Sequence, residues 1–361
     1  MKLDPSIPAF ADRKVRAEFP LRSPCALAFV GDAPGASDVA KLRPFVGSAG
    51  RLFDSMLRAA QVERDQCFVG NVFESQLCED KASAHRALIG EKAWQVLWRE
   101  SLERLADELR RAAPTVVIPM GSVAVKALLD DPRIGALRGS VAMGRGPFAP
   151  WKVLPTLHPT HVLKVWKMYA VCIGDLIRAS GEAADGPLIK YPERSLLLEP
   201  TIEEVEARCY GAYQQTPLLS CDIETGWGHI RGVAFAPSQY EAMYVPFVST
   251  TELTRSYWKE VADERRAWLA VKALLESPTP KLGQNFPLYD VPWLFRKVGI
   301  RPRNVAHDLR LLHAALYPEL PKSLAFMGST YSRQGAWKVW ASFGGEKVKD
   351  RVEGTGDKRD A

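Results

Sequence analysis

The feature that most constrains the fold of this chain is the regular alternation of short apolar runs and amphipathic segments. Apolar runs typical of buried strands occupy Ala26–Val30, Cys67–Phe73, Thr115–Gly121 and Trp151–Pro159. Segments with a helical pattern lie between and after them, at Ala49–Gln61, Lys92–Ala112, Ser122–Leu129 and Thr160–Ala179. This order predicts the α/β class, with a parallel or mostly parallel sheet covered by helices.

Four residues of chemical interest lie at or just after the ends of these runs: Asp32, Asn71, Gly121 and His158. In open parallel sheets ligands bind beyond the carboxyl ends of the strands, so one cleft is expected to collect all four. The run Gly31–Gly50 joins the first strand to the first helix and is rich in Gly and Pro. Such a run lets the backbone approach a ligand closely, although an ordinary strand-to-helix loop remains an alternative.

The residue types of this cleft suit a pocket for a flat base. The ring of Phe45 can stack on a base. The amide of Asn71 can donate to O4 of uracil and accept from its N3–H, whereas cytosine presents the opposite pattern. His158 can stabilise negative charge on a departing base, and Asp32 can orient a water or stabilise an oxocarbenium-like sugar. Hydrolysis of an N-glycosidic bond needs these parts, although each one alone is also a common turn, cap or core residue.

The order of these motifs resembles the uracil-DNA glycosylase superfamily, nearest its family-four type. The matching pieces are GDAPG, RPFVGSAG, a strand ending in Asn, MGSVAVKALL, LRG and LPTLHPTHVL, which cover residues 25–178. The resemblance implies a three-layer αβα domain that excises uracil from DNA. It also implies these roles: water placement by Asp32, stacking by Phe45, uracil reading by Asn71, leaving-group stabilisation by His158, pocket lining by Asp38, and a wedge for the flipped nucleotide near Val162 and Leu163.

Basic residues near these motifs allow two interpretations. Lys164 and Lys167, beside Trp166, are either contacts to DNA phosphates or part of a solvated helix face. The Arg-rich stretch Arg99–Arg111 also contains several Glu residues and is interpreted as an exposed helix.

The cysteines depart from the family-four pattern, as does Asp32, which replaces a Glu and is one methylene shorter. Family-four enzymes bind an iron–sulfur cluster through four cysteines, two of them in a C-x-x-C near the N-terminus. Here no cysteine precedes Cys25, Ser75 stands where a third ligand would be, and Cys78 is displaced from it. We therefore expect no iron–sulfur cluster and no other cofactor in this domain, and most of the six cysteines to be buried thiols.

A second domain is predicted after a linker rich in Gly, Pro and charge. The expected organisation is a glycosylase-like domain at 1–185, a linker at 186–200, a second domain at 201–341 and a disordered tail at 342–361. Within the second domain the sequence predicts helices at Thr201–Tyr213 and 254–275. It predicts strands at Pro217–Thr225, Gly232–Ala236 and Ala242–Val248.

The first of these strands carries a candidate metal site. Asp222 and Glu224 are two residues apart on a strand, so both side chains leave the same face. Asp290 follows in GQNFPLYDVPWL, close to Asn285 and Tyr289. Three carboxylates can hold two Mg²⁺ (or Mn²⁺) ions for phosphodiester hydrolysis, whereas D-x-E alone is more often a solvated strand face.

Residues 199–340 resemble the 3′–5′ exonuclease domain of family-A DNA polymerases, a DEDD-type nuclease, especially phage versions. The resemblance implies a ribonuclease-H-like fold with metal ligation by Asp222, Glu224 and Asp290. It also implies that Asn285 and Tyr289 support the metal ligands from outside the coordination sphere, and that Asp308 has a structural or helix-capping role. The third motif of that family, Tyr-x3-Asp or His-x4-Asp, does not follow, so the domain is expected to be incomplete. A truncated reading frame, a split gene and a degenerate nuclease are the three alternatives.

The sequence thus predicts a DNA-processing protein that excises uracil and carries a linked proofreading-type module. The alternative is a catalytically silent DNA-binding replication accessory, or a fragment of a split phage DNA polymerase. The net charge of +6 permits a nucleic-acid partner. Expected partners are single- or double-stranded DNA containing uracil, and a polymerase subunit or a chain that completes the exonuclease site. No apolar stretch reaches the ~20 residues needed to span a bilayer, so a cytoplasmic location (the host cytoplasm for a phage protein) is expected.

Overall fold

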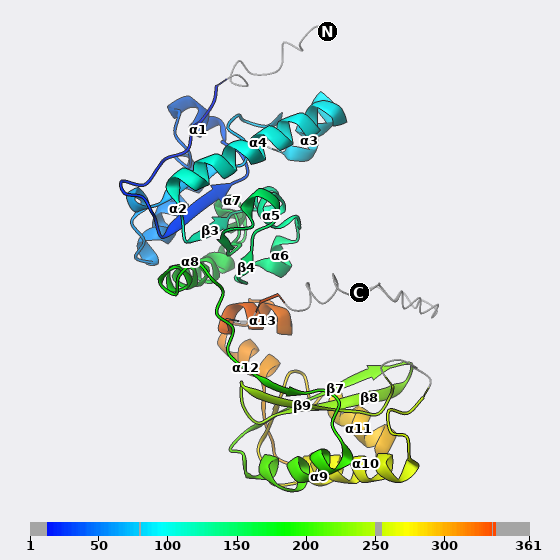
Figure 1. Cartoon of the computed structure of the whole chain (residues 1–361). Coiled ribbons are helices and arrows are strands. Elements are labelled where there is room, and N and C mark those ends of the chain that lie inside the picture. The colour runs from blue at the N-terminus through cyan, green and yellow to red at the C-terminus, as the bar shows by residue number, and fades with distance from the viewer. Residues whose placement is uncertain (1–12, 79–80, 250–254, 334, 337–361) are drawn as a thin grey trace, which may run out of the picture. The chain divides into compact units, whose positions relative to one another are not determined.

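The computed structural model describes residues 13–78, 81–249, 255–333 and 335–336. The predicted tail at 342–361 lies outside these residues. The chain forms two units: one runs to Ile189 and resumes at Ala325, and the other is Lys190–Leu324. Figure 1 shows both units and labels most of their helices and several strands.

The first unit is built on a five-stranded sheet with the order β2-β1-β3-β5-β4. Its strands are β1 (Leu27–Gly31), β2 (Phe68–Asn71), β3 (Val116–Pro119), β4 (Ala142–Met143) and β5 (Lys152–Val153). β1, β2, β3 and β5 are parallel to one another, and only β4, which pairs with β5, is antiparallel. The predicted, mostly parallel sheet is confirmed.

Helices cover both faces of this sheet, which gives three layers. The helices of the first unit are α1 (Ala36–Lys41), α2 (Ser48–Ala59), α3 (Ala82–Ile89), α4 (Glu91–Ala112), α5 (Ser122–Leu129), α6 (Ile134–Leu137), α7 (Pro159–Lys164), α8 (Tyr169–Ala184) and α13 (Leu324–Tyr331). On one face Val30 and Val117 of the sheet pack with Leu105 of α4 and Leu128 of α5. On the other face α2 and α8 contact each other, and α8 contacts β1 and β3.

The predicted helix at Thr160–Ala179 is two helices in the structure. α7 ends at Lys164, a short 3₁₀ turn covers Trp166–Met168, and α8 begins at Tyr169. Trp166 is 60% exposed and its ring stacks on Tyr169 at 4.6 Å. Periodicity alone missed this break because apolar spacing continues across it.

Helix α13 returns to the first unit from more than a hundred residues downstream, although the predicted second domain extends to 341. The guanidinium of Arg138, which is 2% exposed, donates to the hydroxyls of Ser329 (2.6 Å) and Thr330 (3.0 Å) and pairs with Asp175. Arg178 donates to the carbonyl oxygens of Ser329 and Thr330, at 2.8 and 3.1 Å. These contacts make the segment after Ala325 part of the first unit.

We expect Arg138→Met to destabilise the first unit. The substitution leaves Asp175 buried without its cation, and breaking a buried ion pair costs about 3–5 kcal/mol. Hydrogen exchange of β1 and β3 amides, followed by mass spectrometry, measures this loss within one unit. Arg110→Met is the matched control, because Arg110 and its ion-pair partner Asp107 are 58% and 71% exposed. Equal protection in both variants would contradict the structural role of Arg138.

The second unit has a six-stranded sheet with the order β11-β10-β7-β8-β9-β6. Its strands are β6 (Ser195–Leu197), β7 (Leu219–Gly226), β8 (His229–Ala236), β9 (Glu241–Pro246), β10 (Lys281–Gly283) and β11 (Val305–Asp308). β7, β8 and β9 are antiparallel, whereas β10 is parallel to both β7 and β11. Its helices are α9 (Ile202–Tyr210), α10 (Val261–Leu275), α11 (Asp290–Val298) and α12 (Leu309–Leu316).

Helices α9 and α10 lie side by side over one face of this sheet (Figure 1). The structure differs from the predicted linker at one point: Ser195–Leu197 pairs with β9 as strand β6. The helix expected at 254–275 begins at Val261.

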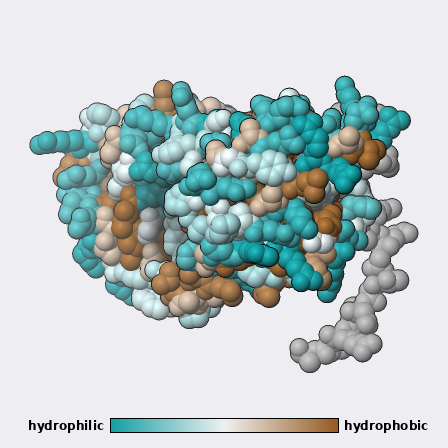
Figure 2. Space-filling model, turned by 90° about the horizontal axis from the view of Figure 1, so that it is seen from below, coloured by the Kyte–Doolittle hydropathy of each residue, from teal (hydrophilic) through white to brown (hydrophobic). Residues whose placement is uncertain are grey.

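Among the described residues no helix has the length and apolar character that crossing a membrane requires. Figure 2 shows one face of the molecule, on which hydrophilic side chains separate the hydrophobic patches.

Candidate active site

Asp32 lies directly after β1, and its carboxylate is held by the start of α5. The backbone N–H of Ala124 donates to Asp32 Oδ1 at 2.8 Å. Gly121, at φ 107, leaves room for this contact: a Cβ there would lie 2.8 and 2.9 Å from the two carboxylate oxygens. Burial raises the pKa of Asp32 to about 6, and the bonds from the backbone of Ala124 and Val123 oppose that rise. The carboxyl group can therefore accept a proton near neutral pH.

Phe45 and Asn71 converge on the backbone of Gly31. A Cβ at Gly31 would lie 2.5 Å from Phe45 Cζ and 2.4 Å from Asn71 Oδ1. Gly31 and Asn71 are register partners at the ends of β1 and β2. The aromatic ring and the amide therefore flank one glycine at the carboxyl edge of the sheet, as expected for strand ends of a parallel sheet.

The amide oxygen of Asn71 is buried and has no hydrogen-bond partner in the structure. Asn71 is 5% exposed. A buried acceptor without a donor costs about 1–3 kcal/mol, so native proteins keep few of them. Such an atom points to a ligand that supplies the missing N–H.

His158 is the N-cap of α7 and lies beside Phe45, with ring centroids 5.8 Å apart. Its Nδ1 accepts the backbone N–H of Thr160 at 3.1 Å, which leaves Nε2 as the protonated donor of the neutral ring. Burial lowers the pKa of His158 to about 4, although the charge of Asp38 favours the protonated form. The imidazole is therefore neutral at pH 7.

The carboxylate of Asp38 stabilises the loop between Gly35 and Val46 by accepting backbone hydrogen bonds. Its Oδ1 accepts the N–H of Val46 at 2.8 Å, and its Oδ2 accepts the N–H of Gly35 at 3.1 Å. One carboxylate thus joins both ends of the segment between Gly35 and Val46. Its negative charge also faces His158.

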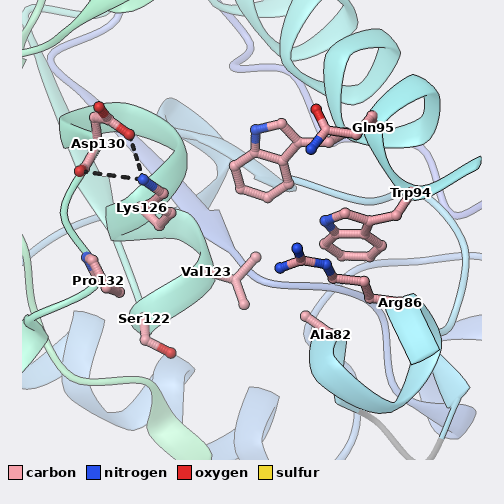
Figure 3. A pocket seen from close by; sticks show the side chains of 10 residues that line it. Ala82, Arg86, Trp94, Gln95, Ser122, Val123, Lys126, Asp130 and Pro132 are labelled. Atoms are coloured by element: carbon pink, nitrogen blue, oxygen red, sulfur yellow. Dashed lines mark hydrogen bonds and ion pairs between the residues drawn. The ribbon is translucent and has the colours of Figure 1, made fainter. Parts of the chain in front are cut away.

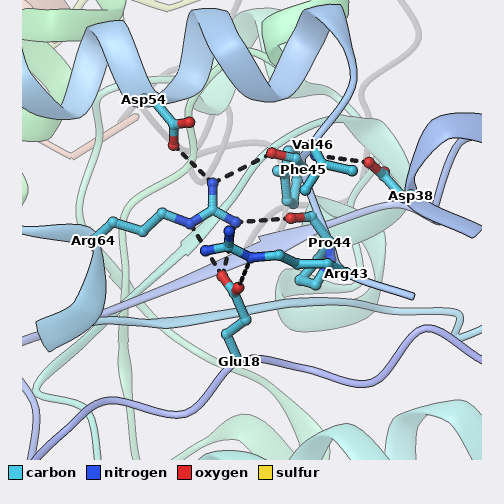
Figure 4. A network of polar contacts seen from close by, with 8 residues as sticks. All are labelled: Glu18, Asp38, Arg43, Pro44, Phe45, Val46, Asp54 and Arg64. Atoms are coloured by element: carbon cyan, nitrogen blue, oxygen red, sulfur yellow. Dashed lines mark hydrogen bonds and ion pairs between the residues drawn. The ribbon is translucent and has the colours of Figure 1, made fainter. Parts of the chain in front are cut away.

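A polar network centred on Arg64 contacts the backbone of Phe45. It was not predicted from the sequence. Arg64 donates to the carbonyl oxygens of Pro44 (2.7 Å) and Phe45 (3.3 Å). Its guanidinium is fixed in turn by Asp54 (2.7 Å) and Glu18 (2.8 Å), as Figure 4 shows. The only sequence signal for this network is a set of charged residues at unrelated positions.

Arg104 makes a comparable contact beneath Asn71. It donates to the carbonyl oxygens of Asn71 (2.8 Å) and Val72 (2.7 Å) and pairs with Glu108. The predicted exposed helix over Arg99–Arg111 is therefore wrong at this position, because Arg104 reaches from α4 to the end of β2. Its side chain is only 23% exposed.

The two residues predicted to form the DNA wedge, Val162 and Leu163, differ in exposure. Val162 is fully buried, so its side chain cannot enter DNA and that part of the prediction is wrong. Leu163 is 44% exposed on the next position of α7, and Lys164 beside it is also exposed. Adjacent helical residues point in different directions, which is why only one of the two remains available.

A separate cavity of about 390 Å³ lies between α3, α4 and α5, and Figure 3 shows its walls. Trp94, Trp98 and Val123 supply its apolar lining. Its two cations are already paired, Arg86 with Glu91 and Lys126 with Asp130. The cavity adjoins the turn that holds Asp32, but its charges are neutralised locally.

The cysteines do not fit an iron–sulfur cluster. All six lie within the described residues and all are free. The thiols of Cys25 and Cys67 donate to the carbonyl oxygens of Leu27 and Glu63, and burial raises the pKa of Cys67 to about 12. A cluster needs four cysteine ligands, whereas among the described residues no group of three or more His, Cys, Asp or Glu side chains could hold a metal.

In the second unit the predicted metal site is not assembled. Asp222 and Glu224 are exposed on one face of β7, but Asp290 is 3% exposed and accepts the N–H of Ile223 at 2.9 Å. Burial raises the pKa of Asp290 to about 7, and Asp222 adds to the rise. Within the described ranges no group of three or more His, Cys, Asp or Glu side chains could hold a metal ion.

The neighbouring residues of the second unit serve local structure. The hydroxyl groups of Tyr289 and Thr225 are 2.6 Å apart, and Asn285 Oδ1 accepts from Arg310 at 2.7 Å. Asp308 is the N-cap of α12, with its carboxylate accepting the N–H of Arg310 and of Leu311. The predicted capping role of Asp308 is confirmed.

The first unit was compared with known proteins. Residues 22–176 match the model of the uracil DNA glycosylase superfamily. This segment is similar to that superfamily over the whole five-stranded α/β unit. The matched range includes Asp32, Phe45, Asn71 and His158.

Curated relatives named type-4 uracil-DNA glycosylase resemble the chain at modest identity. The protein of Thermotoga maritima is 26% identical over 144 residues, which are 38% of this chain and 66% of the relative. That of Pyrobaculum aerophilum is 27% identical over 140 residues, 37% and 66% of the two chains. That of Sulfurisphaera tokodaii is 28% identical over 143 residues, 37% and 60%. The chain therefore spans less than two thirds of the length of these relatives.

Proposed function

We propose that the first unit is a uracil-DNA glycosylase that hydrolyses the N-glycosidic bond of deoxyuridine in DNA. The observation that carries this proposal is the unpartnered, buried Oδ1 of Asn71 next to the ring of Phe45. Uracil supplies what the site lacks: its N3–H donates to Asn71 Oδ1, its O4 accepts from the amide nitrogen, and its face stacks on Phe45. The superfamily match and the type-4 relatives support the same substrate.

The proposed reaction uses Asp32 and His158 on opposite sides of the breaking bond. The bond between C1′ and N1 of uracil breaks, and its electron pair leaves with the base as a uracil anion. The neutral His158 donates a hydrogen bond from Nε2 to that anion. A water held by Asp32 forms the new bond to C1′ and gives up its proton to the carboxylate, which a pKa of about 6 allows. Leu163 and Lys164 are proposed to fill the gap in the DNA and to contact a phosphate.

An oligonucleotide with a single uracil tests this proposal. Incubation with the full chain, followed by alkali, should break the strand at the uracil and leave a cytosine control intact. His158→Gln should slow excision by about 10²–10³-fold, the usual loss on removing one donor to a developing oxyanion. His161→Gln, on the same helix, is the matched control. An intact strand with the wild-type chain would refute the proposal.

For the second unit we propose a nuclease-like module of the kind found in family-A DNA polymerases, which is inactive by itself. Support comes from the sheet, in which the antiparallel strands β9-β8-β7 continue into the parallel strands β10 and β11, as in a ribonuclease-H-like fold. The exposed pair of Asp222 and Glu224 on β7 also fits such a module. The third carboxylate, that of Asp290, is turned into the protein, where it accepts the N–H of Ile223. We therefore assign DNA binding rather than metal chemistry to this module.

A 3′-labelled oligonucleotide with Mg²⁺ tests the second module. We expect little shortening from this chain, and the same low level after Asp222→Ala. Rapid shortening that disappears in Asp222→Ala would show a working nuclease and contradict the assignment.

A further inference from the structure

We infer that Arg64 and Arg104 are positioning residues that fix the two walls of the base pocket. This inference rests on the proposed function. Each guanidinium binds two backbone carbonyl oxygens, and one of the two belongs to a residue that would contact the base. Arg64 binds the backbone of Phe45, and Arg104 binds the backbone of Asn71.

The backbone of Phe45 needs such support. Its φ is +53°, in the left-handed region that a residue with a bulky side chain rarely adopts. Conformations of this kind persist only when the surrounding structure over-determines them. Arg64 binds the carbonyl oxygens on one side of the turn, and Asp38 binds the N–H of Val46 on the other. Figure 4 shows both sets of contacts around the ring.

The guanidinium of Arg64 is fully engaged in hydrogen bonds and ion pairs within the protein. Its side chain is 17% exposed, and both terminal nitrogens are shared between a carboxylate and a carbonyl oxygen. A planar guanidinium can form this pattern, but an ammonium group cannot, because it lacks the rigid fork.

Arg104 plays the same part for Asn71. One terminal nitrogen, Nη2, bridges the carbonyl oxygens of Asn71 and Val72, while Nη1 pairs with Glu108. The next peptide is held from the sheet side, because the N–H of Val72 donates to Gly31 O at 2.9 Å. The Asn71 side chain makes no such bond through Oδ1. The position of the Asn71 amide is thus set by contacts to the Asn71 backbone and not by a hydrogen bond to Oδ1.

Double-mutant cycles test this inference in the full chain. Arg64→Gln and Arg104→Gln are each expected to lower kcat/KM for uracil excision by about 10–100-fold, because small displacements of positioned groups cost that much. Arg64→Gln should add little to Phe45→Ala, and Arg104→Gln should add little to Asn71→Ala, since each arginine acts through one wall. Arg110→Gln is the control, because it breaks an exposed pair on the same helix α4.

Two further readouts separate positioning from a loss of folding. Inhibition by free uracil should weaken about as much as kcat/KM falls, whereas affinity for DNA with an abasic site should stay unchanged. Arg64→Lys should keep the thermal midpoint near that of the wild type and still lose most of the uracil affinity.

The outcomes are distinct. Additive effects within the pairs, or unchanged uracil inhibition, would overturn the inference while excision by the wild type stands. A wild-type chain that neither excises uracil nor binds it would refute the proposed function and, with it, this inference.

Discussion

Asp32→Asn is expected to lower uracil excision by about 10²–10⁴-fold, the usual contribution of a general base. The asparagine oxygen can still accept the N–H of Ala124, so the local fold is kept and the loss comes from the missing base. Single-turnover excision from the single-uracil oligonucleotide measures the effect. Asp107→Asn is the matched control, because that carboxylate is 71% exposed on α4. Excision at the wild-type rate would show that Asp32 does not activate water.

The pH dependence of excision follows from the same carboxyl group. Water activation needs the ionised form, so the rate should rise with pH until it levels off above the pKa of about 6. His158 has a pKa of about 4, so its ring is already neutral at the pH values where Asp32 ionises. It therefore adds no second inflection to the dependence of the excision rate on pH. A bell-shaped profile with a fall between pH 6 and 8 would contradict this assignment.

The free energy of unfolding should fall with rising pH over the range in which the excision rate rises. The pKa of Asp32 lies above its ordinary 3.8, so the folded protein holds this proton more tightly than the unfolded chain. Its contribution to stability is therefore present at low pH and lost as pH rises from about 4 to about 6. Asp32→Asn should remove that fall from the pH dependence of unfolding.

Asn71→Ala is expected to lower kcat/KM for uracil excision by about 10²–10⁴-fold, since hydrogen-bonding sites discriminate strongly against mismatched groups. The physical reason is that both hydrogen bonds to the Watson–Crick edge of the base are lost together. Stability without DNA should be unchanged or higher, because the unpartnered Oδ1 is removed from the interior.

The measurement for Asn71 pairs excision kinetics with thermal unfolding of the same preparations. Gln95→Ala serves as the control, since this amide lies on the exposed side of α4 and binds Glu91. A large loss of stability in Asn71→Ala, in step with the loss of excision, would mean that the amide is a structural residue. Discrimination against cytosine should fall together with uracil excision.

Asp32→Glu examines the departure of this chain from the family-four motif. In the structure the shorter carboxylate is drawn back to the start of α5, at 2.8 Å from the N–H of Ala124. A glutamate would carry its carboxylate one methylene further from the backbone. An increase in single-turnover rate is expected if reach limits water placement.

Much of the first unit could be predicted from residue patterns. Strands, helices and the parallel sheet follow from local periodicity, and the four strand-end sites meet because parallel strands end at one edge. The break before α8 was missed because an apolar pattern does not show where a backbone turns. Strand β6 was missed because three residues of a short edge strand carry little pattern.

The sequence by itself determined which side chains stand at the strand ends as candidates for a base pocket: Asp32, Phe45, Asn71 and His158 lie on short local motifs whose spacing is set along the chain. Only the tertiary structure decided that Val162 is buried and Leu163 exposed, that Arg64 and Arg104 bind the backbone carbonyl oxygens of Phe45 and Asn71, and that α13 returns to Arg138. The reason is physical. Strand and helix patterns depend on neighbours in sequence, whereas burial and the partners of a long arginine depend on segments tens to hundreds of residues away.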